Sequence, residues 1–204
     1  MIQQFENVLT NEMADSIEQH MLSTNFDWKY VSSISGECVN DEAKANDPNI
    51  KDCDGFMHMF VNDGDIISDQ ASILAEIIIA MEKRLNKTID KVERSRAVLL
   101  YKNPTFGDFH QGPHTDYETP HMVMIYYVND SDGDTIFFEE RHTGVTNNNK
   151  KTISERISPK KNKCIVFDGM QYHTGSIPKD NHRVFININL YFRGVNEWMT
   201  LFGI

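Results

Sequence analysis

The sequence predicts a mainly β fold with flanking helices (α+β), of the antiparallel sandwich or jelly-roll type. Short apolar segments alternate with turn signals from residue 95 onward, and one strong amphipathic helix pattern precedes them. The 204 residues contain no internal repeat and suit one domain. We therefore expect a single domain over 1–204, with residues 1–94 as support and residues 95–193 as the β-rich core.

Two helices are expected in the supporting region. Thr10 or Asn11 suits the N-cap of a short helix that runs to residue 22. Residues 26–31 alternate loosely and suit a strand. Ser68 is placed to cap the longer helix, whose apolar residues keep a spacing of three or four: Ile73, Leu74, Ile77, Ile78, Met81 and Leu85. We expect this helix to cover one face of a sheet.

The segment 36–65 has a different composition. Acidic residues outnumber basic ones by eight to two, and apolar residues are sparse outside 56–61. This pattern predicts a long mobile loop, either a solvated connector or a lid over a site.

The β-rich half contains the expected strands of the core. Each is a short apolar segment bounded by Gly, Pro, Asn or Asp. The expected strands cover residues 97–101, 121–128, 135–138, 152–157, 164–167 and 183–192.

Charge and cysteine content exclude several classes of protein. The formal net charge is −10, so the chain lacks the basic field with which proteins bind nucleic-acid backbones. Its apolar runs are too short to span a bilayer, and residues 1–6 do not resemble a secretory signal. Three cysteines without a CxxC pattern argue against a disulfide framework. These features predict a protein of the reducing cytoplasm, with no membrane or nucleic-acid partner.

The chain has one His-x-Asp sequence, formed by His114, Thr115 and Asp116. Residues i and i+2 of a strand share a face, so on a strand His114 and Asp116 would address one metal ion. With His173 they would complete the two-histidine, one-carboxylate triad of non-haem Fe(II) oxygenases, which leaves coordination positions open. By itself His-x-Asp is a weak signal, and a lone histidine is more often structural.

Arg183 follows His173 by ten residues and opens an apolar strand. A turn and a return strand between the two residues would bring the arginine back past the metal. There its guanidinium would suit a bidentate pair with the far carboxylate of a dicarboxylate ligand. The ordinary alternative is a charge at a strand end.

Taken together, these residues resemble the HxD…H…R signature of Fe(II)/2-oxoglutarate-dependent dioxygenases. The resemblance covers roughly residues 95–193. Segments 99–104, 125–129 and 133–138 are similar to the prolyl 4-hydroxylase-like branch, and most similar to its short bacterial and phage members. It implies a double-stranded β-helix, a cupin-like jelly roll, in the cytoplasm of a bacterium or of a phage's host.

The resemblance also implies residue roles. His114, Asp116 and His173 would bind Fe(II), and Arg183 would pair with the distal carboxylate of 2-oxoglutarate. Tyr127 would donate its hydroxyl to that carboxylate, and Tyr101 would line the cosubstrate or substrate pocket. Dioxygen would be the third reactant, and ascorbate is a further candidate cofactor. Aromatic packing in the core is the alternative role for either tyrosine.

The resemblance predicts hydroxylation of prolyl or other residues of a peptide or protein, with conversion of 2-oxoglutarate to succinate. A dioxygenase of a free amino acid or small metabolite is the first alternative, and a non-catalytic cupin-like binding module is the second. Demethylases of the AlkB type carry a second arginine six residues after the first. Asn189 occupies that position here, which argues against a nucleic-acid substrate.

Overall fold

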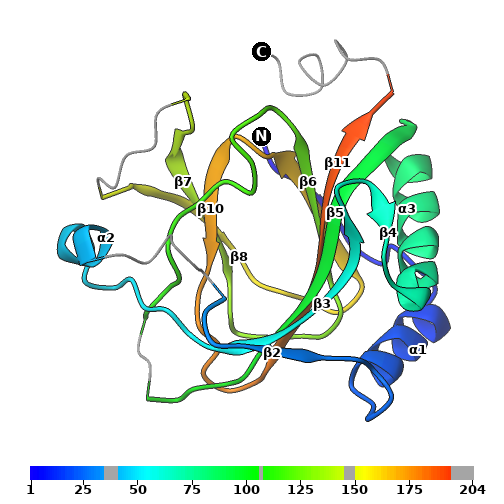
Figure 1. Ribbon diagram of the computed structural model, residues 1–204, viewed down its shortest axis with the longest axis horizontal. Helices are drawn as coiled ribbons and strands as arrows, with labels where there is room; N and C mark the ends of the chain where they lie inside the picture. The colour runs from blue at the N-terminus through cyan, green and yellow to red at the C-terminus, as the bar shows by residue number, and fades with distance from the viewer. Residues whose placement is uncertain (35–40, 106–107, 145–149, 194–204) are drawn as a thin grey trace.

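The computed structural model describes residues 1–34, 41–105, 108–144 and 150–193. Two antiparallel sheets face each other, and helices flank the larger one (Figure 1). The mainly β fold with flanking helices is therefore confirmed. None of the helices among these residues is long and apolar enough to cross a membrane.

The larger sheet follows the order β1-β9-β6-β11-β5-β3-β2, and β4 pairs with β3. The smaller sheet has the order β10-β7-β8. The strands of the larger sheet are β1 (Gln3–Phe5), β2 (Lys29–Val31), β3 (Gly55–Asn62), β4 (Asp65–Ile66), β5 (Ile89–Leu100), β6 (Met122–Tyr127), β9 (Lys163–Asp168) and β11 (Arg183–Phe192). Those of the smaller sheet are β7 (Thr135–Arg141), β8 (Ile153–Ile157) and β10 (Gln171–Gly175).

Helices α1 (Asn11–Met21) and α3 (Ser72–Leu85) lie along the same face of the larger sheet (Figure 1). The Thr10 hydroxyl caps α1 by accepting from the amide of Met13. Ser68 caps the 3₁₀ turn η2 (Asp69–Ala71) ahead of α3, rather than α3 itself. The buried faces of both helices pack on the sheet and form the largest apolar core.

Strands β5 and β11 present opposite chemistry on their two faces. On β11, Val184, Ile186, Ile188 and Leu190 enter the core beneath the helices. The alternate residues Arg183, Phe185, Asn187 and Asn189 face the space between the sheets, since side chains alternate along a strand. A second apolar cluster fills part of that space, and Ile125 and Phe137 belong to it.

The segment 36–65 departs from the expected long loop. It contains the helix α2 (Asp41–Asn46) and the strands β3 and β4, while residues 36–40 lie outside the described residues. Strand β3 joins the sheet because its apolar residues pair with β5, at Phe56↔Leu99 and Met57↔Val98. Acidic residues lie on both sides of the apolar stretch of β3, among them Asp52, Asp54 and Asp63, so the overall composition of the segment did not indicate a strand.

Two strands of the β-rich half, β5 and β10, also differ from the expected strands. Strand β5 begins at Ile89, eight residues before the expected start at residue 97. The first part of the strand was missed because polar residues such as Arg94 and Arg96 interrupt its apolar pattern. Strand β10 was not expected, since polar residues interrupt its apolar pattern. It carries His173, so the smaller sheet positions one candidate metal ligand.

Candidate metal centre and anion cavity

His114, Asp116 and His173 converge in the space between the sheets. One potential ligand atom from each lies within 4.8 Å of the others, with Asp116 Oδ2 3.8 Å from His173 Nε2. His173 belongs to β10, whereas His114 forms an isolated antiparallel bridge with it and Asp116 lies in a bend. The expected strand through His114 and Asp116 is therefore replaced by a single bridge and a turn, which still directs both side chains to one point.

Each histidine is oriented by a main-chain carbonyl. His114 Nδ1 lies 2.9 Å from the Gly112 oxygen, and His173 Nδ1 lies 3.1 Å from the Gln171 oxygen. A carbonyl only accepts hydrogen bonds, so each Nδ1 carries the proton and each Nε2 keeps a lone pair. Burial lowers the pKa of His114, and it lowers that of His173 to about 4. Both rings are therefore neutral near pH 7, as metal ligands must be.

Asp116 is held from both sides. Its Oδ1 accepts from Arg94 Nη2 at 2.7 Å and lies 3.7 Å from Arg96 Nη2. Its Oδ2 accepts from the amides of Asn187 at 3.2 Å and Asn189 at 2.9 Å. Burial acts to raise the pKa of Asp116, but the surrounding histidines and arginines together hold it well below its usual range. The carboxylate is therefore ionised and fixed in orientation.

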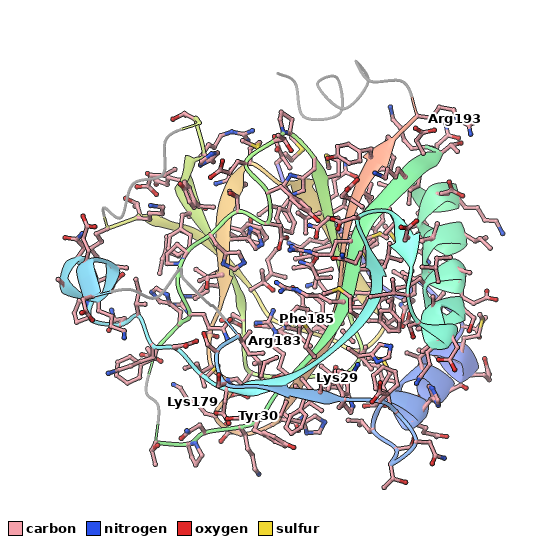
Figure 2. All side chains as sticks on the ribbon, viewed as in Figure 1. Lys29, Tyr30, Lys179, Arg183, Phe185 and Arg193 are labelled. Atoms are coloured by element: carbon pink, nitrogen blue, oxygen red, sulfur yellow. The ribbon has the colours of Figure 1, made fainter. Side chains whose placement is uncertain are left out.

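Arg183 lines the same cavity as the two histidines. The cavity has an empty volume of about 450 Å³, including the part open to solvent, and His114, His173 and Arg183 all line it. Arg183 is 2% exposed, and its guanidinium stacks on the Phe185 ring at 4.5 Å (Figure 2). It donates to neutral acceptors, the Asp134 carbonyl at 3.1 Å and the Thr135 hydroxyl at 2.8 Å.

Arg183 forms no salt bridge with a carboxylate among the described residues, although the Asp134 charge acts on it electrostatically, and its Nε is buried without a hydrogen-bond partner. Burial lowers the pKa of the guanidinium. A buried charge without a counter-ion is unfavourable unless a ligand of opposite charge completes the site. The cavity therefore suits an anion.

The two tyrosines occupy different positions. Tyr127 is fully buried, and its hydroxyl lies 2.6 Å from the Thr135 hydroxyl, one hydrogen bond removed from Arg183. Burial raises its pKa to about 12. Tyr101 is 58% exposed and lines a second cavity with Tyr30 and Cys53. This cavity adjoins the first, since Gln111 of the first donates to the Cys53 sulfur at 3.0 Å.

The sequence reasoning did not identify Arg94, Arg96 or Thr135 as site residues. Arg94 and Arg96 share one face of β5, and that i, i+2 spacing was the available signal. Asn187 and Asn189 share a face of β11 by their i, i+2 spacing, but their contact with Asp116 depends on the fold.

Solved structures with a similar fold include enzymes of the 2-oxoglutarate oxygenase class. An oxidoreductase of the 2OG-Fe(II) oxygenase family from Burkholderia pseudomallei matches with a TM-score of 0.61 and 11% identity, over 93% of this chain and 84% of that one. A Trichoplax adhaerens prolyl hydroxylase in complex with a hypoxia-inducible factor peptide matches with a TM-score of 0.55 and 14% identity, over 93% and 83%.

The epimerase SnoN in complex with Fe3+, α-ketoglutarate and nogalamycin RO matches with a TM-score of 0.60 and 12% identity, over 96% of this chain and 82% of that one. No family model matches the sequence, and no curated protein is similar to it. At these identities the likeness is one of fold. The expected jelly-roll, cupin-like fold is confirmed.

The donor set fits a divalent transition metal. Two neutral imidazoles and one ionised carboxylate form a ligand set typical of non-haem Fe(II), and their atoms approach closely enough to share one ion. The carbonyl partners of both histidines and the amide partners of Asp116 supply the surrounding hydrogen bonds that such ligands need.

Proposed function

We propose that this protein is an Fe(II)- and 2-oxoglutarate-dependent hydroxylase that acts on prolyl or other residues of a peptide or protein and forms succinate. One observation carries the proposal. The triad of His114, Asp116 and His173 adjoins a cavity that is also lined by the buried cation Arg183, which forms no salt bridge with a carboxylate among the described residues. A 2-oxo acid with a distal carboxylate would chelate a metal held by the triad and would supply the carboxylate partner that Arg183 lacks.

In this proposal the three triad residues hold Fe(II), which, with 2-oxoglutarate and dioxygen, supplies oxidative hydroxylation when bound. Arg183 holds the distal carboxylate in a position fixed by Thr135 and the ring of Phe185. Thr135 is in turn held by Tyr127. The apolar side chains of Val98, Ile125 and Phe185 line the cavity and exclude water around the cosubstrate.

The peptide or protein substrate is proposed to enter beside Tyr101. The second cavity has an empty volume of about 770 Å³, including open solvent, and it adjoins the first at Cys53. The exposed rings of Tyr30 and Tyr101 line it, together with two acidic residues, Asp52 and Asp54, and one basic residue, Lys102. The balance of charge is negative, which suits a peptide of basic or neutral character.

The test is anaerobic purification with Fe(II), followed by a screen of peptides and free amino acids for substrate-stimulated succinate. We expect His114→Ala and Asp116→Ala to abolish tight Fe(II) binding and turnover. The exposed His20→Ala variant serves as the matched control and should retain both. Turnover retained in both ligand variants would show that the ligands are misassigned.

A small-molecule substrate is the second candidate, because the epimerase of similar fold was solved with the small molecule nogalamycin RO. The same screen separates the two, since a free amino acid or metabolite would stimulate succinate formation where no peptide does. Metal and 2-oxoglutarate binding without succinate formation under any condition would favour a non-catalytic binding module.

A further inference from the structure

We propose that dioxygen reaches the metal centre through a separate apolar path, which begins at a third cavity and ends beside the triad. The inference rests on the proposed function and deepens it, because it assigns an entry to the third reactant. In that function the cosubstrate occupies the first cavity and the substrate enters through the second. A gas that arrives after both are bound therefore needs an entry of its own.

The third cavity lies beside Ile2, near the N-terminal end of the chain. It has an empty volume of about 620 Å³, including the part open to solvent, and the rings of Phe137 and Phe167 form part of its wall. The charged side chains among its described lining residues are all carboxylates: Glu139, Glu155 and Asp168. They repel an anion such as 2-oxoglutarate, but an uncharged diatomic molecule is not affected.

One apolar cluster connects this cavity with the first. Two partly buried residues pack against the cluster, Ile2 at the third cavity and Phe185 at the first. The cluster also contains Phe137 and Phe167 of the third cavity and Ile125 of the first. Its buried members come from β6, β7, β8 and β9 and carry no charge: Val123, Ile125, Tyr127, Phe137, Ile157, Ile165 and Phe167. We call this cluster the apolar path.

Strand pairing makes members of the apolar path immediate neighbours. In the register of β6 and β9, Phe167 lies opposite Val123, and Ile165 lies opposite Ile125. Residues two apart share a face of a sheet, so Ile165 follows Phe167, and Ile125 follows Val123, on the face toward the space between the sheets. An apolar molecule that enters beside Phe167 therefore meets only hydrocarbon side chains before it reaches Ile125 in the first cavity.

Phe137 and Phe167 separate the third cavity from His173. The two rings pack edge to face with centroids 4.8 Å apart, and the Phe167 centroid lies 4.8 Å from that of the His173 ring. Both phenylalanines are at most 1% exposed. Side chains in a close-packed interior still change rotamer, so these rings can let a small apolar molecule pass while they exclude water and ions.

The experiment measures relaxation caused by dissolved dioxygen, which is paramagnetic, in EDTA-treated, metal-free protein with labelled isoleucine δ1-methyl groups. The methyl groups of the apolar path are those of Ile125, Ile157 and Ile165. Matched controls, equally buried in the largest apolar core, are Ile77, Ile186 and Ile188. We expect the relaxation to be at least about twofold greater in the apolar path, because the gas concentrates in apolar surroundings that it can reach. Equal relaxation of the two sets would overturn the inference.

Ile2→Trp should narrow the entrance, since Ile2 lines the third cavity from a partly buried position and the buried members of the path stay unaltered. We expect it to lower the dioxygen relaxation of Ile165 by at least about twofold. In the metal-loaded enzyme it should raise KM for dioxygen by about the same factor and leave KM for 2-oxoglutarate unchanged. Ile79→Trp is the matched control, because Ile79 is exposed on α3, and it should change neither value.

An unchanged KM for dioxygen in Ile2→Trp would also overturn the inference. Thermal melting checks that each variant is folded, and Ile2→Phe replaces Ile2→Trp if the latter is not. If the protein forms succinate but the two sets of methyl groups relax equally, this inference alone fails. If the unaltered protein binds neither Mn²⁺ nor 2-oxoglutarate, the proposed function fails, whatever the methyl relaxation shows.

Discussion

The main-chain amide of His114 donates to the carbonyl oxygen of His173 at 3.0 Å, and the amide of His173 donates to the carbonyl oxygen of His114 at the same distance. This reciprocal pair makes the two imidazoles cross-strand neighbours, with ring centroids 4.8 Å apart. The spacing of the two candidate ligands is therefore set by main-chain pairing, and Asp116 is the ligand whose position depends on side-chain contacts.

Removal of a partner of Asp116 should weaken metal binding without removing a ligand. Asn189→Ala deletes the 2.9 Å hydrogen bond to Oδ2, so the carboxylate loses part of its orientation. We expect Mn²⁺ affinity to fall by roughly 10- to 100-fold, the usual range for partners of metal ligands. Titration of the Mn²⁺ paramagnetic resonance signal measures this, with the exposed Asn25→Ala as control. Unchanged affinity would mean that Arg94 and Asn187 suffice.

Arg183→Ala should leave the metal bound but weaken 2-oxoglutarate by about 2–5 kcal/mol, because it removes one member of a buried charge pair. Tyr127→Phe should have a smaller effect, about 1 kcal/mol, because its hydroxyl contacts Thr135 rather than the guanidinium. Calorimetric titration of the Mn²⁺-loaded variants with 2-oxoglutarate gives both values. A larger loss in Tyr127→Phe would indicate that the tyrosine contacts the ligand directly.

Gly175 leaves the space that the Arg183 guanidinium fills. A Cβ at Gly175 would collide with Nη1 of Arg183, so Gly175→Ala must displace the side chain from its position beside Thr135. We expect weaker 2-oxoglutarate binding with Mn²⁺ affinity retained. Gly169→Ala is the control, since its Cβ would collide with the ring of His121 instead. It should lower stability and spare cosubstrate affinity, and the reverse pattern would contradict the assignment of Arg183.

The metal-free protein should lose stability as the pH falls below 6.5. Burial holds the pKa of His173 at about 4, so between pH 6.5 and 4 the unfolded chain binds a proton that the folded chain does not. The free energy of unfolding should therefore fall by about 3 kcal/mol over this range. Urea denaturation at several pH values measures the slope. His173→Asn should show a shallower slope, and an equal slope would assign the effect to other groups.

Much of the fold follows from local pattern. The bounds of α1 and β11 agree closely with the apolar periodicity, and of the two N-cap candidates, Thr10 and Asn11, it is Thr10 that caps α1. Strand β10 was not predicted because polar side chains such as His173 interrupt its apolar pattern. Strand β3 was not predicted because acidic residues lie on both sides of it and dominate the composition of the segment.

Some residues of the candidate site could also be predicted from the sequence, and others could not. His114, Asp116, His173 and Arg183 could be selected from residue type and order, because metal and carboxylate chemistry restricts the residues that serve. Arg94 and Arg96 could not, because their role depends on which strand lies beside β11, and that pairing is long-range. Tyr101 lines the adjoining cavity rather than the one that contains Arg183, so its assignment to a cosubstrate or substrate pocket stays a prediction.

The alternation of β5 and β11 has a consequence for how the chain reaches its native state. A shift of either strand by a single residue would turn Arg96 or Arg183 toward the core beneath α1 and α3 and turn Ala97 or Ile186 toward the space between the sheets. Either shift would bury a guanidinium group in hydrocarbon, so the observed register is strongly favoured over the registers one residue away. Arg183, which faces the anion cavity, thus also helps to fix the register of β11.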